Sequence, residues 1–353
     1  MTVVGDVVLF AIGAVIVSVI LLSAVRTVVI PHGGSVRLTE AVFSTSRRLA
    51  GTYARIDRSP HRQHAALQVL LAAGLLALPI VWLTSAVIGY TLMFKAVGTD
   101  EWRDAYELAG SSIFTLGFAR AADLPRMTLA FTGAALAISI LALLLVTYLP
   151  SIYAAYQARE TRLTSFETIA GDPPDVVGMM VRAHEINGLD RLSELWEGWQ
   201  LWFAELRESH TALPAVAFLG SSRPDRNWVA TVGTLLDAAA VSLAVADGPR
   251  QSNAALCIRS GTLALRDIAE YLGVAVDHDP APDDPISVSR HRWDAAYDAL
   301  VRAGVPVYDR ESAWTNWAGW RVNYDMALVG LGRLTASPTT RLEDGGGYRL
   351  GPL

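Results

Sequence analysis

The stretch MTLAFTGAALAISILALLLVTYL, residues 127–149, contains no charged side chain and ends immediately before Pro150. A helix needs about 20 apolar residues to cross the roughly 30 Å of hydrocarbon in a lipid bilayer, and this stretch meets that requirement. Residues 7–30 and 67–94 meet it as well, although the latter stretch contains Pro79. The sequence therefore predicts an integral membrane protein with three transmembrane helices.

The composition of the chain changes after residue 150. Its 353 residues are 52% hydrophobic with a mean hydropathy of +0.32, and the long apolar runs all lie in the first half. The second half is charged and rich in tryptophan, and it has helical periodicity without alternating β-branched runs. A chain of this length is typical of about two domains. We therefore expect an all-α membrane region followed by an all-α helical domain.

The first apolar stretch has two interpretations, a cleaved signal peptide or a retained helix. It is longer than the apolar part of a signal peptide, no basic residue precedes it, and no small-residue cleavage site occurs before Arg26. We therefore expect a retained transmembrane helix over residues 1–31.

The charges of the loops predict an orientation in the membrane. Residues 31–66 are rich in arginine, whereas residues 98–125 carry mostly acidic side chains. Positively charged loops stay in the cytoplasm. We therefore expect the N-terminus and residues 98–125 outside the cell, and the loop 31–66 and everything after residue 150 in the cytoplasm.

A shorter segment between the second and third spans is too polar to cross a membrane. Residues 102–114 have the spacing of a short helix, and the letters TLGF, residues 115–118, follow directly. Non-helical backbone at membrane depth is tolerated only where protein buries it or where it lines a water-filled cavity. The pattern predicts a re-entrant loop, and several copies of the chain around an axis would be needed to close a ring of such loops.

Residues 67–150 resemble the potassium-channel superfamily, whose members have an outer helix, a pore helix, a filter and an inner helix. The filter of that family reads Thr-Val-Gly-Tyr-Gly, and its carbonyl groups replace the hydration shell of the ion. Thr115, Leu116, Gly117 and Phe118 match its first four positions, and Asp123 is similar to the acidic residue beyond it. The resemblance implies a homotetramer that binds K⁺ or Na⁺ as permeant ions and has no other cofactor.

Two positions depart from the family pattern. Ala119 replaces the second filter glycine and Arg120 replaces the acidic residue that follows it. Alanine is disfavoured at positive φ, and a ring of arginines at the pore mouth would repel cations unless Asp123 or Glu107 paired with them. Ion selectivity therefore stays open. Gly133 in the third span is either a hinge or a site of close helix packing.

The resemblance and the patterns together imply five regions. They are an N-terminal transmembrane helix (1–31), a basic cytoplasmic linker (32–66), the pore domain (67–150), a cytoplasmic helical domain (151–336) and a flexible tail (337–353). Residues 151–163 are expected to continue the inner helix. Further helices are expected at 175–186, 189–210, 227–246, 251–273, 287–303 and 310–335. Residues 221–241 and 318–335 resemble actinobacterial potassium-channel-like proteins, which implies a bacterial plasma membrane.

Other features of the second half favour structure over chemistry. Trp196, Trp199 and Trp202 have the spacing of a buried helix stripe. Asp237 lies in an apolar helix and needs a partner, for which Arg259, Arg266 and Arg321 are the candidates. No catalytic motif, metal-binding spacing or basic tract is present, so we expect neither an enzyme nor a nucleic-acid-binding protein. Cys257 is the only cysteine, which excludes an intrachain disulfide.

The sequence thus favours an oligomeric cation channel with a TLGF filter. The cytoplasmic helical domain would gate it through residues 153–162, in response to a pH change, an unknown ligand or membrane tension. The alternative is a membrane-anchored sensor or scaffold that keeps the architecture of a channel but does not conduct. An enzyme in the second half is a third possibility that no motif supports.

Overall fold

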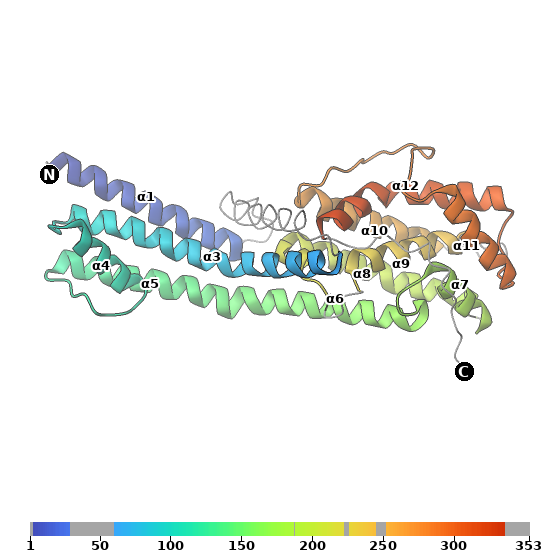
Figure 1. Ribbon diagram of the computed structural model, residues 1–353, viewed down its shortest axis with the longest axis horizontal. Coiled ribbons are helices and arrows are strands. Elements are labelled where there is room, and N and C mark those ends of the chain that lie inside the picture. The colour runs from blue at the N-terminus through green and yellow to red at the C-terminus, as the bar shows by residue number, and fades with distance from the viewer. Residues whose placement is uncertain (1–2, 29–59, 187, 222–225, 245–251, 336–353) are drawn as a thin grey trace. The chain divides into compact units, whose positions relative to one another are not determined.

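The computed structural model describes residues 3–28, 60–186, 188–221, 226–244 and 252–335, and all secondary-structure elements among them are helices (Figure 1). The all-α prediction is therefore confirmed for the described residues. Most of the expected linker and the whole expected tail lie outside these residues. The chain divides into two compact units, Met1–Arg58 with Val69–Ala154, and Ser59–Gln68 with Ala155–Leu353.

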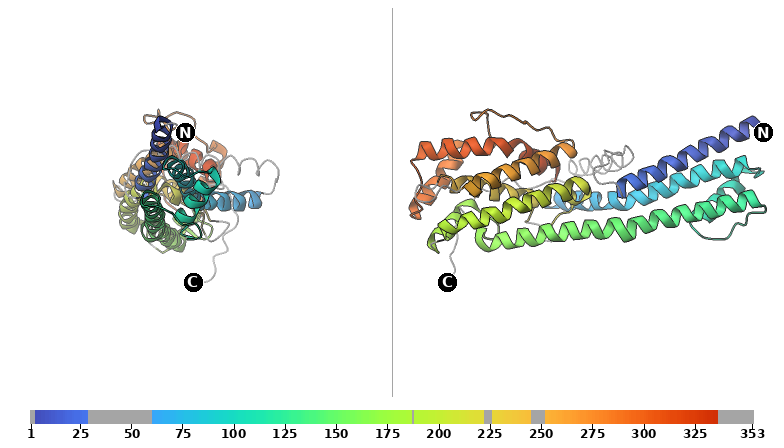
Figure 2. Two further views of the ribbon diagram at one scale, coloured as in Figure 1. Left: turned by 90° about the vertical axis from the view of Figure 1, so that its left-hand side faces the viewer. Right: turned by 180° about the vertical axis from the view of Figure 1, so that it is seen from behind.

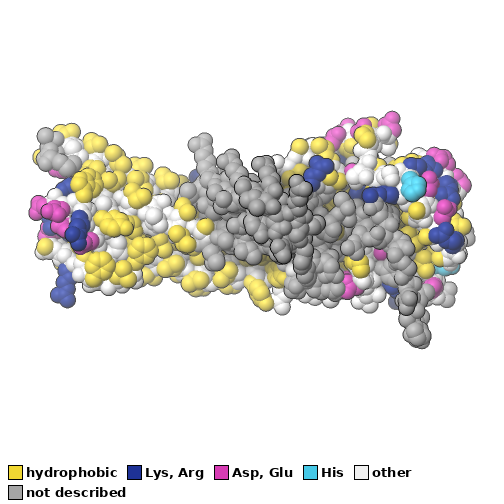
Figure 3. Space-filling model, in the orientation of Figure 1, with side chains coloured by type: hydrophobic (Ala, Val, Ile, Leu, Met, Phe, Trp, Pro, Cys, Tyr) yellow, Lys and Arg dark blue, Asp and Glu magenta, His cyan; other side chains and the backbone are white. Residues whose placement is uncertain are grey.

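Three helices contain segments long and apolar enough to cross a membrane, as expected for a membrane protein. These segments are Val3–Thr27 in α1 (Val3–Val28), Pro79–Ala96 in α3 (Pro60–Ala96), and Leu124–Ala170. Helix α3 begins at Pro60, several residues before the expected start at residue 67, because proline is favoured in the first turn of a helix. The visible face of the first unit is covered mainly by hydrophobic side chains, and charged side chains gather at one end (Figure 3).

Two glycines bring α1 and α3 into close contact. A Cβ atom added to Gly13 would lie 2.5 Å from the carbonyl oxygen of Gly89 and 2.7 Å from Cγ of Met93. Such close approach of two backbones is a common way for helices to associate in a membrane. Further along the same pair of helices, the buried indole of Trp82 donates a hydrogen bond to Oγ of Ser23 at 3.3 Å. Packing and one polar contact therefore hold α1 against α3.

The short helix α4 (Trp102–Ile113) lies between α3 and α5 (Leu124–Ala142) in sequence and packs against the end of the first unit (Figures 1 and 2). Ala105, Ala109 and Ile113 form its buried face. Helix α5 continues without a break into a π-helical stretch, η1 (Leu143–Tyr148), and then into α6 (Leu149–Ala170). The third span and the first helix of the second unit are therefore one continuous helix.

The second unit is built around α9 (Trp228–Ser242), in which every residue except Ala230 is buried. A helix that is apolar on all sides belongs in a core. Around it lie α7 (Val176–Glu185), η2 (Leu189–Arg191), α8 (Leu192–Ala212), η3 (Pro214–Phe218), α10 (Ser252–Tyr271), α11 (Arg290–Arg302) and α12 (Arg310–Leu334). These bounds agree with the expected helices to within about one helical turn.

Helices α8 and α10 run parallel and are joined at intervals of seven residues. Nδ2 of Asn253 donates to the carbonyl of Ser193 at 3.2 Å, and Oγ of Ser260 donates to the carbonyl of Gln200 at 2.9 Å. One further interval along, Arg207 and Asp267 form an ion pair. A seven-residue interval keeps one face of each helix toward its partner. The three contacts therefore fix the register of the two helices.

We predict that Gly13→Ala destabilises the first unit. The added methyl group would meet the backbone of α3, which cannot move as a side chain can. The measurement is the temperature at which the detergent-solubilised protein loses helical circular dichroism. Gly110→Ala in α4 is the matched control, because no atom lies within 4 Å of its added Cβ and alanine favours a helix. Equal melting temperatures for the two variants would contradict the prediction.

Candidate functional site

The four residues expected to form the filter follow α4 directly, and the turn that positions them is a helix cap. The amide of Thr115 donates to the carbonyl of Ser112 at 3.1 Å, and the amide of Leu116 donates to the carbonyl of Ser111 at 2.9 Å. This pair of bonds is the Schellman motif, which requires a left-handed residue after the cap. Thr115 takes that conformation with φ of 53°, although β-branched residues rarely do.

Ser111 holds the rest of the turn in place. Its hydroxyl accepts a hydrogen bond from the amide of Ala119 at 3.1 Å, and its carbonyl is also 3.5 Å from the amide of Gly117. The Ser111 side chain is buried on the inner face of α4. Sequence reasoning missed this role. The signal was a hydroxyl on the apolar face of an amphipathic helix, one turn before the helix ends.

The turn that Ser111 supports is exposed. Leu116 and Phe118 are 63% and 64% exposed, and Thr115 and Gly117 are exposed as well. Gly117 has φ of 71°, with no atom within 4 Å of an added Cβ. Ala119 is half-buried and is not at positive φ. The backbone strain expected at Ala119 therefore lies at Thr115 instead.

Asp123 and Glu107, the two acids considered as partners of Arg120, each pair with another residue. Asp123 caps α5 by accepting from the amide of Arg126 at 3.0 Å, and its carboxylate is 3.5 Å from Nε of the same residue. Glu107 pairs with Arg103 at 2.9 Å. Arg120 is exposed, and its side chain forms no hydrogen bond or ion pair with any residue that the structure describes.

Gly133 lies where α5 meets its neighbours. A Cβ added to it would be 3.2 Å from the ring of Tyr90 on α3 and 3.4 Å from Cδ1 of Ile113 on α4. The residue is buried in an unbroken helix. This geometry supports the packing interpretation, and a hinge at Gly133 stays a prediction.

One exposed stripe of α5 is small and carries hydroxyl groups. It consists of Thr128, Thr132, Ala135, Ser139 and Ala142, spaced alternately by four and three residues. The hydroxyls of Thr128, Thr132 and Ser139 each donate to a carbonyl of the preceding turn, at 2.8 to 2.9 Å. The stripe is more polar than the bulky apolar stripe beside it, which contains Phe131 and Ile138.

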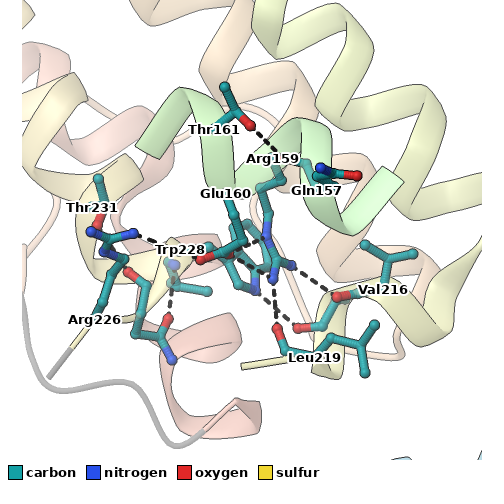
Figure 4. Close-up of polar contacts among 12 residues, drawn as sticks. Gln157, Arg159, Glu160, Thr161, Val216, Leu219, Arg226, Trp228 and Thr231 are labelled. Atoms are coloured by element: carbon teal, nitrogen blue, oxygen red, sulfur yellow. Dashed lines mark hydrogen bonds and ion pairs between the residues drawn. The ribbon is translucent and has the colours of Figure 1, made fainter. Parts of the chain in front are cut away.

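In the second unit, α6 is held by the side chain of Arg159, which is 2% exposed (Figure 4). All five of its N–H groups are used. Nε and Nη2 donate to Glu160, Nη2 donates to the carbonyl of Leu219, and Nη1 donates to the carbonyl of Val216 and to Nε2 of His210. A buried guanidinium is tolerated when its donors are satisfied in this way.

His210 is held in one tautomer by its neighbours. Nδ1 lies 3.0 Å from the carbonyl of Leu206 and therefore carries the proton, which leaves Nε2 free to accept from Arg159. The ring is fully buried beside Trp228. Burial first, and then the charge of Arg159, lower the pKa of His210 well below its ordinary value. The imidazole is therefore neutral in the folded protein.

A second arginine ties the start of α9 to α6. Arg226 donates to Oγ1 of Thr164 at 2.9 Å and forms an ion pair with Glu167. Together with Arg159, it attaches the middle and the C-terminal half of α6 to three other segments of the second unit. Sequence reasoning placed this part of the chain at the joint between the two domains but did not find these contacts.

The expected partner of Asp237 is Arg321, one of the three candidates. Nη1 of Arg321 donates to both carboxylate oxygens of Asp237, at 2.6 and 2.7 Å, and Nε donates to Asp325 at 2.7 Å. The hydroxyl of Tyr324 donates to Asp237 at 2.8 Å. Burial raises the pKa of the Asp237 carboxyl, and Arg321 opposes that rise. The network is an internal ion pair, since Asp237 and Arg321 are both fully buried.

The remaining candidates of the second half are structural. Trp196, Trp199 and Trp202 are buried in one hydrophobic core. Cys257 is buried, and burial raises the pKa of its thiol. No cluster of metal-ligating side chains occurs among the residues that the structure describes.

Comparison of the chain with protein-family models, with curated proteins and with solved structures finds no match.

We predict that Asp237→Asn strongly destabilises the second unit, by about 3–5 kcal/mol, because removing one charge leaves Arg321 buried with an incomplete partner set. The measurement is denaturant unfolding of the full-length protein in detergent, followed by tryptophan fluorescence. Asp298→Asn is the matched control, because Asp298 pairs with Arg310 at the exposed surface. A surface ion pair contributes little, so equal losses in the two variants would contradict the prediction.

We also predict that the second unit loses stability as the pH falls below about 6.5, the ordinary pKa of histidine. His210 has a lowered pKa when folded, so below pH 6.5 the unfolded chain binds a proton that the folded chain does not. The check is the unfolding midpoint of the full-length protein at pH 7.5 and at pH 5. His210→Gln should reduce the difference between the two midpoints, whereas His291→Gln at an exposed position should not. An unchanged difference in the His210 variant would exclude this histidine as the cause.

Proposed function

We propose that this protein is an oligomeric, potassium-channel-like cation channel that passes K⁺ or Na⁺ through a ring of Thr115–Phe118 segments. The observation that carries the proposal is the exposed turn after α4, which Ser111 supports between two helices long enough to span a membrane. An exposed apolar turn of this kind needs a covering that the single chain does not provide. Copies arranged around an axis would provide it.

The end of α4 favours a cation beside this turn. A helix carries a partial negative charge at its C-terminus, where its last carbonyl groups lack intrahelical partners. Thr115 and Leu116 follow that end of α4 directly. Several such helix ends around one axis would add to the attraction that carbonyl and hydroxyl oxygens exert on an ion.

The exposed hydroxyl stripe of α5 suits the wall of a water-filled path. Thr128, Thr132 and Ser139 retain acceptor capacity after donating to their own helix. Against hydrocarbon, these hydroxyl-bearing side chains would make no favourable contact that alanine or leucine would lack. Toward the other end of the span, the bulky side chains of Leu145 and Leu149 are exposed and would narrow the path in a closed state.

The continuous helix from α5 to α6 provides a route for gating. Arg159 and Arg226 attach α6 to the second unit, and Gly133 attaches α5 to α3 and α4. Between these attachments lie the π-helical η1 and Pro150. A π-helical turn and a proline both weaken the regular bonding of a helix. A change in the second unit would therefore be transmitted to the span through this segment.

A non-conducting sensor or scaffold is the second candidate function, and Arg120 favours it. Its side chain is exposed just beyond the proposed filter and has no partner among the described residues of its own chain. A ring of unpaired arginines at the mouth of a pore would repel cations. Under this alternative, the two units would respond to a signal together without passing ions.

We predict that liposomes containing the purified protein take up K⁺ or Na⁺ down a gradient, and that Gly117→Val reduces the uptake at least tenfold. Valine is disfavoured at the positive φ of Gly117, yet no atom lies within 4 Å of an added Cβ, so the turn should be displaced without unfolding the chain. Gly273→Val is the matched control, because Gly273 also has a positive φ with no atom within 4 Å of an added Cβ, and it should retain uptake.

The same assay separates the two candidate functions. The absence of cation uptake by the unmodified protein, in both gradients and from pH 5 to pH 8, would reject the channel and leave the sensor or scaffold.

A further inference from the structure

One face of α4 presents aromatic side chains that its own chain does not cover. Trp102, Tyr106 and Phe114 are 51%, 60% and 48% exposed, and Gly110 completes the stripe at intervals of four residues. Lys95 lies 5.8 Å from the centre of the Trp102 ring, but most of the stripe is open. No atom lies within 4 Å of a Cβ added to Gly110, so another chain can approach closely there.

Unpaired charges of opposite sign lie toward the two ends of this stripe. Glu101 and Asp104 are exposed at the N-terminal end of α4, and neither side chain is bonded to any residue that the structure describes. Arg120 follows the C-terminal end, where Ser111 binds the adjacent Ala119. Asp104 and Ser111 are seven residues apart on α4, a rise of about 10 Å. The acidic pair and Arg120 therefore lie toward opposite ends of the stripe, and neither acid forms an ion pair with Arg120 within the chain.

Opposite charges at the two ends of one stripe make it complementary to a second copy in two arrangements. In a two-fold contact with antiparallel stripes, Arg120 of each copy meets the acidic end of the other, and assembly stops at a dimer. In a head-to-tail contact, repetition around an axis closes a ring. The ring of Thr115–Phe118 segments in the proposed function needs the second arrangement.

We propose that the aromatic stripe of α4 is the contact surface for a second copy of this chain, with Arg120 of one copy paired to Asp104 or Glu101 of the next. The contact deepens the proposed function, because a ring of Thr115–Phe118 segments needs a head-to-tail interface at this level of the chain. It also gives Arg120 a role other than blocking a pore. An arginine paired with a neighbouring carboxylate presents less positive charge to the axis.

Cysteine cross-linking in membranes tests this contact, because Cys257 is buried and its thiol is unreactive. The double variant Arg120→Cys with Asp104→Cys, treated with a short thiol-specific cross-linker, should give a ladder of covalent dimer, trimer and tetramer. Each single variant should stay uncross-linked, since a head-to-tail contact never brings two identical positions together. Arg103→Cys with Asp104→Cys is the matched control, because both thiols then lie at one end of α4, and it should give no ladder.

Charge exchange provides a second measurement that does not depend on cross-linking. Arg120→Glu should lower the fraction of oligomer found by light scattering in mild detergent, and Arg120→Glu with Asp104→Arg should restore it. A covalent dimer without trimer or tetramer in the double variant would overturn the proposal in favour of a two-fold contact, and so would cross-linking of the Arg120→Cys single variant. Uncross-linked protein in every variant, with no effect of charge exchange, would overturn it in favour of an α4 face covered by lipid headgroups.

The outcome is separable from that of the ion-uptake assay. A ladder without cation uptake retains the contact and rejects the channel. Uptake without a ladder retains the channel and rejects this contact.

Discussion

Every backbone N–H and C=O group within a membrane must find a partner in the protein, since hydrocarbon offers none. The long helices of the first unit meet this constraint by themselves. The turn after α4 would meet it at membrane depth only with help from Ser111, whose carbonyl and hydroxyl accept hydrogen bonds from Leu116 and Ala119. The cost is a threonine at positive φ. Such strain persists where the surrounding structure fixes it, and often marks a functional segment.

In the second unit, an equivalent constraint applies to charged side chains that are buried. A buried ion is tolerated only when its hydrogen-bonding capacity is nearly complete, and the two buried arginines satisfy this differently. Arg159 uses backbone carbonyls, one histidine and one carboxylate, so it joins α6 to segments that carry no opposing charge. Arg321 uses two aspartates and links α12 to α9. The contacts of Arg159 attach α6 to the rest of the second unit, whereas the contacts of Arg321 stabilise the core of that unit.

The helices were predictable from sequence, because apolar periodicity and capping residues act over a few neighbours. Asp237 was recognisable as a buried acid for the same reason, but its choice of Arg321 over Arg266 depends on tertiary packing. Arg266 instead donates to the carbonyls of Asn323 and His278. The hydroxyl of Ser111 on the apolar face of α4 was a signal, but its partner Ala119 was not predictable, because that bond depends on the fold of the turn. The parallel register of α8 and α10 was not predictable either, because its contacts join residues 60 positions apart in sequence. The place of Thr115 just after a short helix was predictable from the sequence, whereas its left-handed backbone conformation was not.

The length of one uninterrupted helix limits how the two units can influence each other. An α-helix resists bending over several turns. A displacement of α6 at Arg159 therefore either moves the third span or bends the helix between Arg159 and Gly133. Bending requires the least energy at the π-helical stretch and Pro150, since the regular backbone hydrogen bonding of the helix is already altered there. If that segment took up the whole displacement, the second unit would have no effect on the span. Under the proposed gating, the five bonds of Arg159 and the tight packing at Gly133 would act against this outcome, because they hold the continuous helix on both sides of η1 and Pro150. A helix held on both sides of a weak point transmits rotation even when it bends there.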